Sequence, residues 1–253
     1  MASPPVADTA RELGIELDQP TSVNDDGARA RIAGVRPEAV CVCAFGSLIK
    51  EPLLSEHELI NVHPSLLPRW RGAAPIERAI MAGDAQTGVS IMRLTAGLDS
   101  GPVCLQATEP IDSHDNYGSL AQRLEQLGGE LLILALDEHP ECSEQDESLA
   151  TYAEKITRAD RRLDPSRTAP ELERAVRALT PHTGAYVELT DGTSLGVREA
   201  RAVPGAGPAQ GGVSLSGPRP MLGCAEGALE LLVVQPPGRR EMSGEDFLRG
   251  RRR

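Results

Sequence analysis

One short segment constrains the fold of this chain more than any other. The run from Val40 to Phe45, VCVCAF, is apolar throughout, and a proline and a glycine bracket it. A continuous apolar run of this length is typical of a strand that a parallel sheet buries on both faces. The sequence therefore predicts an internal strand of an α/β layer, with Cys41 and Cys43 as small buried thiols.

The elements around this run alternate between strand and helix patterns, as in an α/β architecture. Apolar spacing predicts a leucine-rich helix from Ser119 to Leu136, and a proline followed by a glycine eight residues later marks a shorter one. The predicted strands are Ile15–Leu17, Ile60–His63, Val89–Leu94 and Pro102–Thr108, and the predicted helices before residue 119 are Thr9–Leu13, Asn24–Ala33 and Pro75–Ala82.

The pattern changes after about residue 140, where a polar stretch precedes an amphipathic helix at Ala169–Leu179. Two strand patterns then flank Asp191-Gly192, a strong hairpin signal. Short strands with Gly/Pro-rich turns predict a small β-barrel or sandwich. We therefore expect an α/β domain at 1–140, a linker at 141–165 and a β-rich domain at 166–253.

Composition narrows the class of protein. The chain has 40% hydrophobic residues and a net charge of −11, with 10 basic and 24 acidic residues up to position 150 and 16 and 13 beyond it. This asymmetry indicates different partners for the two parts, or a solvated surface with a basic tail. Nothing resembles a secretory signal or a membrane span. Five cysteines without a CxxC pair are compatible with a reducing cytoplasm, and no metal site is expected.

Two polar residues share one side of a predicted strand. Because side chains alternate along a strand, Asn61 and His63 lie on one face and Ile60 and Val62 on the other. Pro64 favours an extended conformation for His63. Ligands of open α/β sheets bind at the carboxyl ends of strands, so this pair is a candidate site. An ordinary surface histidine is the alternative.

A loop aspartate is the second candidate. Asp99 lies between Gly97 and Gly101, and glycines suit a loop that turns tightly or approaches a ligand closely. A carboxylate beside an imidazole raises the basicity of the ring and can fix its tautomer. Asp99 is therefore a candidate partner of His63, with an ordinary turn aspartate as the alternative.

The segment from Ile60 to Val103, which contains both candidates, resembles the folate-dependent formyltransferases. The resemblance rests on N-x-H followed by SLLP, then R-G-x-x-P, T-G-x-x-I and G-x-D-x-G. YAEKI from Tyr152 looks like the interdomain linker of the methionyl-tRNA branch of that family. QPPGRREM from Gln235 and the following FLRGRR resemble its C-terminal domain, so the resemblance covers nearly the whole chain from Ser3 onward.

The resemblance implies a Rossmann-like catalytic domain followed by an OB-like barrel that helps hold tRNA. It implies transfer of a formyl group from 10-formyltetrahydrofolate to the α-amine of initiator methionyl-tRNA, and we expect a cytoplasmic monomer. By similarity, Asn61 donates a hydrogen bond to the formyl oxygen and His63 stabilises the oxyanion and assists proton transfer. Asp99 orients or charges His63.

The resemblance also implies residues that hold the two substrates. Arginine suits phosphate and stacks on bases, and Trp70 either joins such contacts or plugs a domain interface. The residues expected to contact folate are Ser65, Leu66, Leu67, Pro68, Phe45 and Gly46. The residues expected to contact tRNA are Arg69, Arg71, Arg239 and Arg240, with the terminal arginines.

Two points leave alternatives open. Relatives begin with a strand–helix–strand unit that would precede Met1, so we expect either a start placed too far downstream or a decayed copy, with VCVCAF losing a neighbouring strand. The alternatives in function are a sugar-nucleotide or glycinamide-ribonucleotide formyltransferase, a 10-formyltetrahydrofolate hydrolase, or a non-catalytic remnant that binds tRNA or folate.

Overall fold

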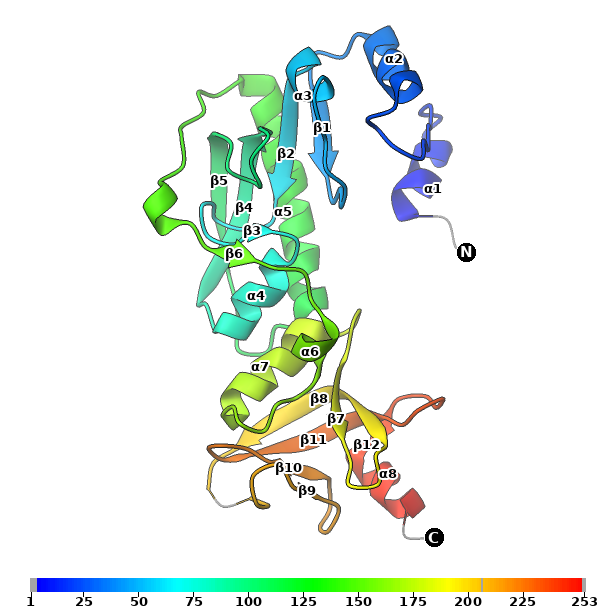
Figure 1. The fold of residues 1–253 in the computed structure, drawn as a ribbon, viewed down its shortest axis with the longest axis vertical. Helices are drawn as coiled ribbons and strands as arrows, with labels where there is room; N and C mark the ends of the chain where they lie inside the picture. Colours follow the sequence, from blue (N-terminus) through cyan, green and yellow to red (C-terminus); the bar gives the residue numbers. More distant parts are fainter. Residues whose placement is uncertain (1–3, 206, 252–253) are drawn as a thin grey trace.

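A four-stranded sheet forms the centre of the first half of the molecule (Figure 1). The computed structural model describes residues 4–205 and 207–251. Strands β1 (Val40–Cys43), β2 (Leu59–His63), β4 (Gln86–Arg93) and β5 (Val103–Pro110) lie in the order β1-β2-β4-β5. The pair β1–β2 is parallel, whereas β4 runs antiparallel to β2 and to β5. The α/β layer predicted from the sequence is confirmed.

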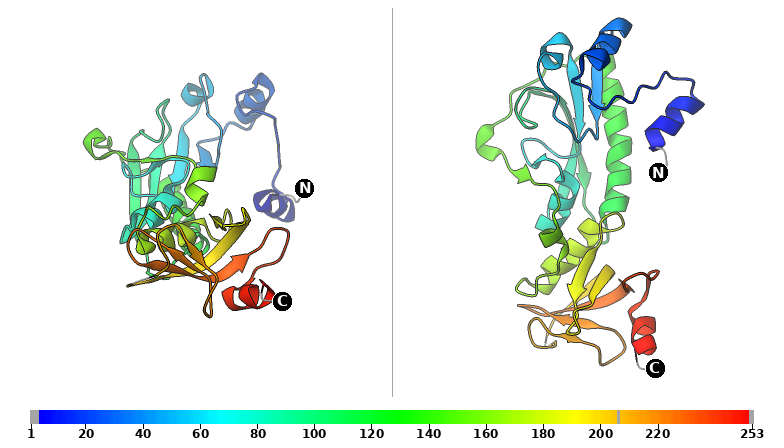
Figure 2. Two further views of the ribbon diagram at one scale, coloured as in Figure 1. Left: turned by 60° about the horizontal axis from the view of Figure 1, so that its bottom comes forward. Right: turned by 45° about the vertical axis from the view of Figure 1, so that its right-hand side comes forward.

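Helix α5 (Tyr117–Glu138) covers one face of this sheet along β2, β4 and β5 (Figures 1 and 2). Asn116 caps its N-terminus by accepting a hydrogen bond from Ser119 N at 3.0 Å, which satisfies a backbone donor that the helix cannot use itself. The remaining helices of this half are α1 (Pro5–Glu12), α2 (Asp26–Val35), α3 (Leu53–Glu56) and α4 (Pro75–Ala82).

Two predictions for the start of the chain are wrong. Cys41 and Cys43 are exposed, because β1 is the edge strand and only Val42 of its central residues turns into the core. Ile15–Leu17 forms no strand; Ile15 is 58% exposed, and its backbone N–H donates to Ala10 O of α1 at 2.8 Å instead of to a neighbouring strand. Apolar runs alone do not reveal whether a neighbouring strand is present.

The second half is an antiparallel sheet of six strands that curls into a half-barrel, the open counterpart of the predicted OB-like barrel. Its order is β7-β8-β11-β10-β9, with β12 paired to β11. Helix α7 (Ala169–Leu179) packs against β8. The other elements are β7 (Ala185–Glu188), β8 (Ser194–Val203), β9 (Val213–Ser214), β10 (Met221–Gly223), β11 (Ala228–Gln235), β12 (Met242–Ser243) and α8 (Gly244–Arg251).

The segment between the halves is tied to both of them. Its β6 (Tyr152–Ala153) pairs in parallel with β3 (Arg71–Gly72), which lies in the loop after β2. It also contains the short helices η1 (Glu147–Leu149) and α6 (Arg158–Arg161). Helix α7 packs against α4 as well as against the half-barrel. The linker is therefore part of the folded structure near the candidate site.

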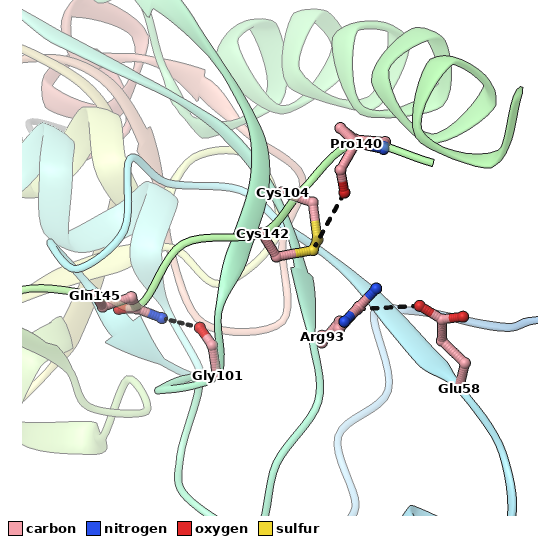
Figure 3. Close-up of a disulfide and its surroundings, with 7 residues drawn as sticks. All are labelled: Glu58, Arg93, Gly101, Cys104, Pro140, Cys142 and Gln145. Carbon is pink, nitrogen blue, oxygen red and sulfur yellow. Dashed lines mark hydrogen bonds and ion pairs between the residues drawn. A yellow bond between two sulfur atoms is a disulfide. The ribbon is translucent and has the colours of Figure 1, made fainter. Parts of the chain in front are cut away.

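A disulfide joins β5 to the segment after α5. Cys104 and Cys142 are bonded although they lie 38 residues apart in the sequence (Figure 3). Val103 and Ser143 pair through two backbone hydrogen bonds of 2.8 and 2.9 Å, so the two cysteines face each other as the next cross-strand pair. No sequence pattern indicated this pair, and the expected reducing compartment would favour its dithiol form.

Within the described part of the chain, no helix is long and apolar enough to cross a lipid bilayer.

Candidate active site

Strand β2 presents the first two candidate residues on one face. Asn61 is opposite Val42 of β1 and Met92 of β4, and His63 is opposite Ser90 of β4. His63 ends the strand and is 4% exposed, whereas Asn61 is half-buried. Within residues 4–205 and 207–251, the Asn61 carboxamide makes no hydrogen bond to the protein. Its N–H groups are therefore available to a ligand.

The His63 ring lies between a backbone carbonyl and a carboxylate. Its Nε2 is 2.9 Å from Trp70 O, and its Nδ1 is 3.7 Å from Asp99 Oδ2. A carbonyl oxygen can only accept, so Nε2 carries a proton and Nδ1 is the basic nitrogen of the neutral ring. Burial lowers the pKa of His63 below its ordinary value, and this outweighs the opposite effects of Asp99 and of the Trp70 carbonyl. The ring is therefore neutral near pH 7, and its basic nitrogen, Nδ1, faces Asp99.

The loop after β4 brings Asp99 back to this ring. The loop begins at the far end of β2, where Leu94 N bonds Leu59 O at 2.9 Å, and then folds back. Asp99 adopts a left-handed conformation with φ 45°, which a non-glycine residue holds only when its surroundings fix it. The side chain is 15% exposed. Sequence reasoning assigned the tight turn to the flanking glycines, whereas Asp99 itself has the unusual backbone.

Glycine at position 72 permits the contact that holds the carboxylate. Gly72 N donates to Asp99 Oδ2 at 2.8 Å. Gly72 has φ 115°, and a Cβ atom there would lie 2.8 Å from Ala153 O. Any larger residue would separate β3 from β6 and move the donor away from Asp99.

The predicted folate loop is fixed by buried polar contacts that sequence reasoning missed. Ser90 Oγ donates to Ser65 O at 2.6 Å and accepts from Leu67 N at 3.0 Å. Gln106 Nε2 donates to Leu67 O and to Ser90 Oγ, both at 2.8 Å. Ser65 is fully buried, and its hydroxyl donates to Arg69 O at 2.6 Å. The only sequence signal for Ser90 was its place in the T-G-x-x-I run, and Gln106 had none.

The remaining predicted folate residues lie on the surface around this loop. Phe45, which is 42% exposed, and Gly46 follow β1, whose carboxyl end is beside that of β2 because the two strands are parallel. Leu66 lines a cavity of about 250 Å³ that also contains Trp70 and the start of β4. Asn61, His63 and Asp99 do not line this cavity.

The two arginines that flank Trp70 have different surroundings. Arg69 is exposed, lies 4.4 Å above the Trp70 ring and donates to both carboxylate oxygens of Asp84 at 2.7 and 2.8 Å. Trp70 Nε1 donates to the same carboxylate at 2.8 Å. Arg71 is 2% exposed and donates to both carboxylate oxygens of Glu147 at 2.7 and 2.8 Å. The prediction that Arg71 contacts tRNA is therefore corrected, because its guanidinium is buried against the linker.

The arginines predicted in the C-terminal half lie on its surface. Arg239 and Arg240 are exposed in the turn between β11 and β12. Arg251, at the end of α8, forms an ion pair with Asp191 at 2.5 Å. Arg252 and Arg253, also predicted to contact phosphate, lie outside the described residues. Among the described residues, no group of three or more His, Cys, Asp or Glu side chains could hold a metal ion.

Two known protein families match this chain, one for each half. Residues 1–136 match the family described as formyl transferase, and residues 155–252 match the family described as formyl transferase, C-terminal domain. The chain therefore belongs to the formyl transferases, which use folate.

Curated relatives identify the branch of that family. The chain is 41% identical to the methionyl-tRNA formyltransferase of Gluconobacter oxydans over 249 residues, which cover 97% of this chain and 82% of that protein. It is also 41% identical to the enzyme of the same name from Pseudomonas paraeruginosa, over 98% of this chain and 81% of the relative. The alignments with these transferases extend over nearly the whole chain, so they include both of its domains.

Solved structures share the fold. The methionyl-tRNA formyltransferase from Clostridium thermocellum aligns with a TM-score of 0.62 at 14% identity, over 78% of this chain and 87% of that one. HypX from Aquifex aeolicus, solved with tetrahydrofolic acid, aligns with a TM-score of 0.64 at 18% identity, over 84% of this chain and 38% of that one.

Proposed function

We propose that this chain transfers the formyl group of 10-formyltetrahydrofolate to the α-amine of initiator methionyl-tRNA, in the cytoplasm and as a monomer. The observation that carries the proposal is the approach of His63 Nδ1 to Asp99 Oδ2, at 3.7 Å, on the face of β2 that also presents Asn61. The 41% identity to methionyl-tRNA formyltransferases over 97% of the chain supports the choice of acceptor.

The proton of the acceptor amine goes to His63 in this scheme. The α-amine must be neutral to attack the formyl carbon, and a general base removes the proton that the attack releases. His63 is neutral near pH 7 because burial lowers its pKa. When Nδ1 takes the proton, the imidazolium lies beside the Asp99 carboxylate, which stabilises it. The same proton is then available to the folate nitrogen when its bond to the formyl carbon breaks.

Asn61 has the second role in the scheme. Attack on the formyl carbon places negative charge on the formyl oxygen, and a fixed donor at that position lowers the barrier. The Asn61 carboxamide is half-buried and unused by other described residues. It can therefore donate to the oxygen without losing an existing hydrogen bond.

The loop from Ser65 to Pro68 and the residues Phe45 and Gly46 are proposed to hold the folate. The exposed Phe45 and the half-buried Leu66 offer apolar surface for a flat pterin ring, and Ser65 and Leu67 fix the loop through buried contacts. The domain bounds follow the same division: 1–140 for catalysis, 141–165 as linker and 166–253 for tRNA.

Arg69, Arg239 and Arg240 are proposed to contact the RNA backbone, because all three are exposed cations. Arg240→Gln together with Arg239→Gln should lower the slope of log K against log salt by roughly 1–2, since each phosphate contact contributes about 0.9 for duplex nucleic acid. Filter binding of methionyl-tRNA from 50 to 300 mM salt measures the slope. An unchanged slope removes these two residues from the interface.

The reaction itself is tested by supplying 10-formyltetrahydrofolate with different acceptors. We expect formylation of methionyl-tRNA at least 100-fold faster, in kcat/KM, than of an amino-sugar nucleotide or of water. Because one solved neighbour is a sugar N-formyltransferase and another is described as a likely one, the sugar acceptor is the informative comparison. Faster reaction with the sugar acceptor would assign the chain to that class, and folate hydrolysis without acceptor would assign it to the hydrolases.

A further inference from the structure

We propose that Gln145 is a positioning residue, which holds the backbone of Asp99 so that the carboxylate stays beside His63. The proposal rests on the function proposed above, in that it takes Asp99 to act on His63. Gln145 lies in the segment after α5, more than 40 residues from Asp99 in the sequence, and belongs to none of the motifs discussed so far.

The carboxamide of Gln145 uses all of its hydrogen-bonding capacity at this position. Its Nε2 donates to Asp99 O at 2.8 Å and to Gly101 O at 2.7 Å (Figure 3 shows the second bond). Its Oε1 accepts from Arg71 Nε at 3.0 Å and from Arg71 Nη2 at 2.9 Å. One side chain therefore joins the Asp99 loop to the buried arginine of the loop after β2.

Asp99 needs such a contact because its backbone is unfavourable. A φ of 45° in a residue with a Cβ is sterically unfavourable and persists only where the surrounding structure fixes it. The side chain is held by Gly72 N, and the carbonyl is held by Gln145. Asp99 is thus held at its side chain and at its carbonyl. Without the hydrogen bond from Gln145, its backbone is free to return to a more favourable conformation, which would move the carboxylate away from His63.

Gln145 is itself fixed from both directions along the chain. On the N-terminal side, the paired backbone hydrogen bonds of Val103 and Ser143 attach the segment to β5, and this attachment does not depend on the oxidation state of Cys104 and Cys142. On the C-terminal side, Glu147 binds Arg71 through two hydrogen bonds. A side chain placed between two such anchors can set the position of a loop with little freedom of its own.

The position of Asp99 affects the pKa of the His63 imidazole. Among the described residues, Asp99 is the charged side chain that acts on His63. The other neighbours of the His63 ring are the Trp70 carbonyl and, on β4, Ser90. Asp99 raises the pKa of His63, against the larger lowering by burial. If Asp99 withdraws, the pKa of His63 falls further, and Nδ1 becomes a weaker base.

Two variants test the proposal in the full chain. Gln145→Met keeps the length of the side chain and removes its polar atoms, and Gln145→Glu keeps an acceptor for Arg71 but cannot donate to Asp99 O. Gln126→Met is the matched control, because Gln126 is an exposed residue of α5 that bonds only Glu130. We expect both Gln145 variants to lower kcat about 10–100-fold, with KM for either substrate within about threefold and the control unchanged.

The readout that separates positioning from general stability is the titration of the His63 ring nitrogens, followed by 15N NMR. We expect the His63 midpoint and the acidic limb of the kcat–pH profile to move to lower pH in both Gln145 variants. If the His63 titration is unchanged in both variants, the proposal is overturned, whatever happens to kcat or to the melting temperature.

The titration also separates this proposal from the proposed function. If the unmodified chain fails to formylate methionyl-tRNA, the proposed function is wrong. The His63 midpoint still reports whether Gln145 places Asp99, because it requires no turnover. A shifted midpoint then supports the positioning role in whatever reaction the site performs.

Discussion

The half-barrel and the loops of the candidate site are held by different kinds of contact. In the half-barrel, Leu195, Leu229 and Leu231 are completely buried and pack with other apolar residues from α7 and α8. Around the candidate site, the loops are fixed by side chains such as Gln145 and Ser90, which bond backbone atoms. Apolar packing is non-directional and contributes mainly to stability, whereas hydrogen bonds fix direction and distance.

The comparison separates stability from catalytic geometry within one chain. A change in the half-barrel should lower the free energy of unfolding and leave the folded site intact. A change in the site loops should alter turnover more than it alters stability.

Asn61→Ala should lower kcat about 100–1000-fold, because a donor to the developing oxyanion is lost. The melting temperature should stay close to that of the unmodified protein, since no described residue bonds this carboxamide. Asn116→Ala is the matched control; it removes the cap of α5 and should cost about 1 kcal/mol of stability with little effect on kcat. Formylation rates and thermal melts measure both, and turnover within a few-fold of normal for Asn61→Ala would exclude its catalytic role.

Leu231→Ala should destabilise the protein by about 3 kcal/mol, because a fully buried side chain leaves a cavity in the half-barrel. Urea unfolding measures the loss, and kcat of the folded fraction should be normal. A large fall in kcat with unchanged stability would contradict the division between the two regions.

Asp115→Asn removes the charge of one partner of an ion pair at the start of α5. The substitution should lower the free energy of unfolding by about 2 kcal/mol at pH 7. Arg123 donates to both Asp115 oxygens at 2.7 and 2.8 Å and holds the pKa of this carboxyl well below its usual range. A lowered folded pKa stabilises the fold above the ordinary aspartate pKa, and the contribution disappears as the pH falls through the folded value.

The stability difference between Asp115→Asn and the unmodified chain should therefore be constant from about pH 5 to 8 and shrink below about pH 4. Urea unfolding across this range provides the measurement. A difference that persists unchanged at pH 3 would show that the ion pair with Arg123 is not its origin.

Cys41→Ser and Cys224→Ser compare two thiols in different surroundings. Cys41 lies exposed on the edge strand, whereas Cys224 is buried in the half-barrel core. We expect a change of less than about 0.5 kcal/mol for the first and about 1 kcal/mol for the second. Denaturation midpoints measure both stability changes. Equal losses of stability for the two variants would mean that β1 is covered in solution.

Local patterns predicted the regular elements well. The helices Ala169–Leu179 and Pro75–Ala82 have the predicted bounds. For the first helix, the reason is local: Thr168 accepts from Glu171 N and Glu171 accepts from Thr168 N, so the capping box fixes its start. Such signals act over a few residues and can be seen in one sequence.

Contacts between distant loops were not predictable in this way. Asn61 and His63 were placed on one face by strand alternation, and the family resemblance joined them to Asp99. The burial of Arg71 depends on Glu147, 76 residues away, and the disulfide depends on the return of the chain beside β5. The left-handed backbone of Asp99 likewise follows from tertiary contacts, because aspartate has no strong preference for it.

Helix α7 contributes to both apolar cores: Ala178 belongs to the core under the sheet and Leu179 to that of the half-barrel. Proteolytic cleavage in the turn just before it, at residues 164–166, would sever the covalent connection and leave this buried surface in place. Separating the two fragments would expose the surface to water, which is unfavourable. The nicked protein should therefore remain associated as a non-covalent complex.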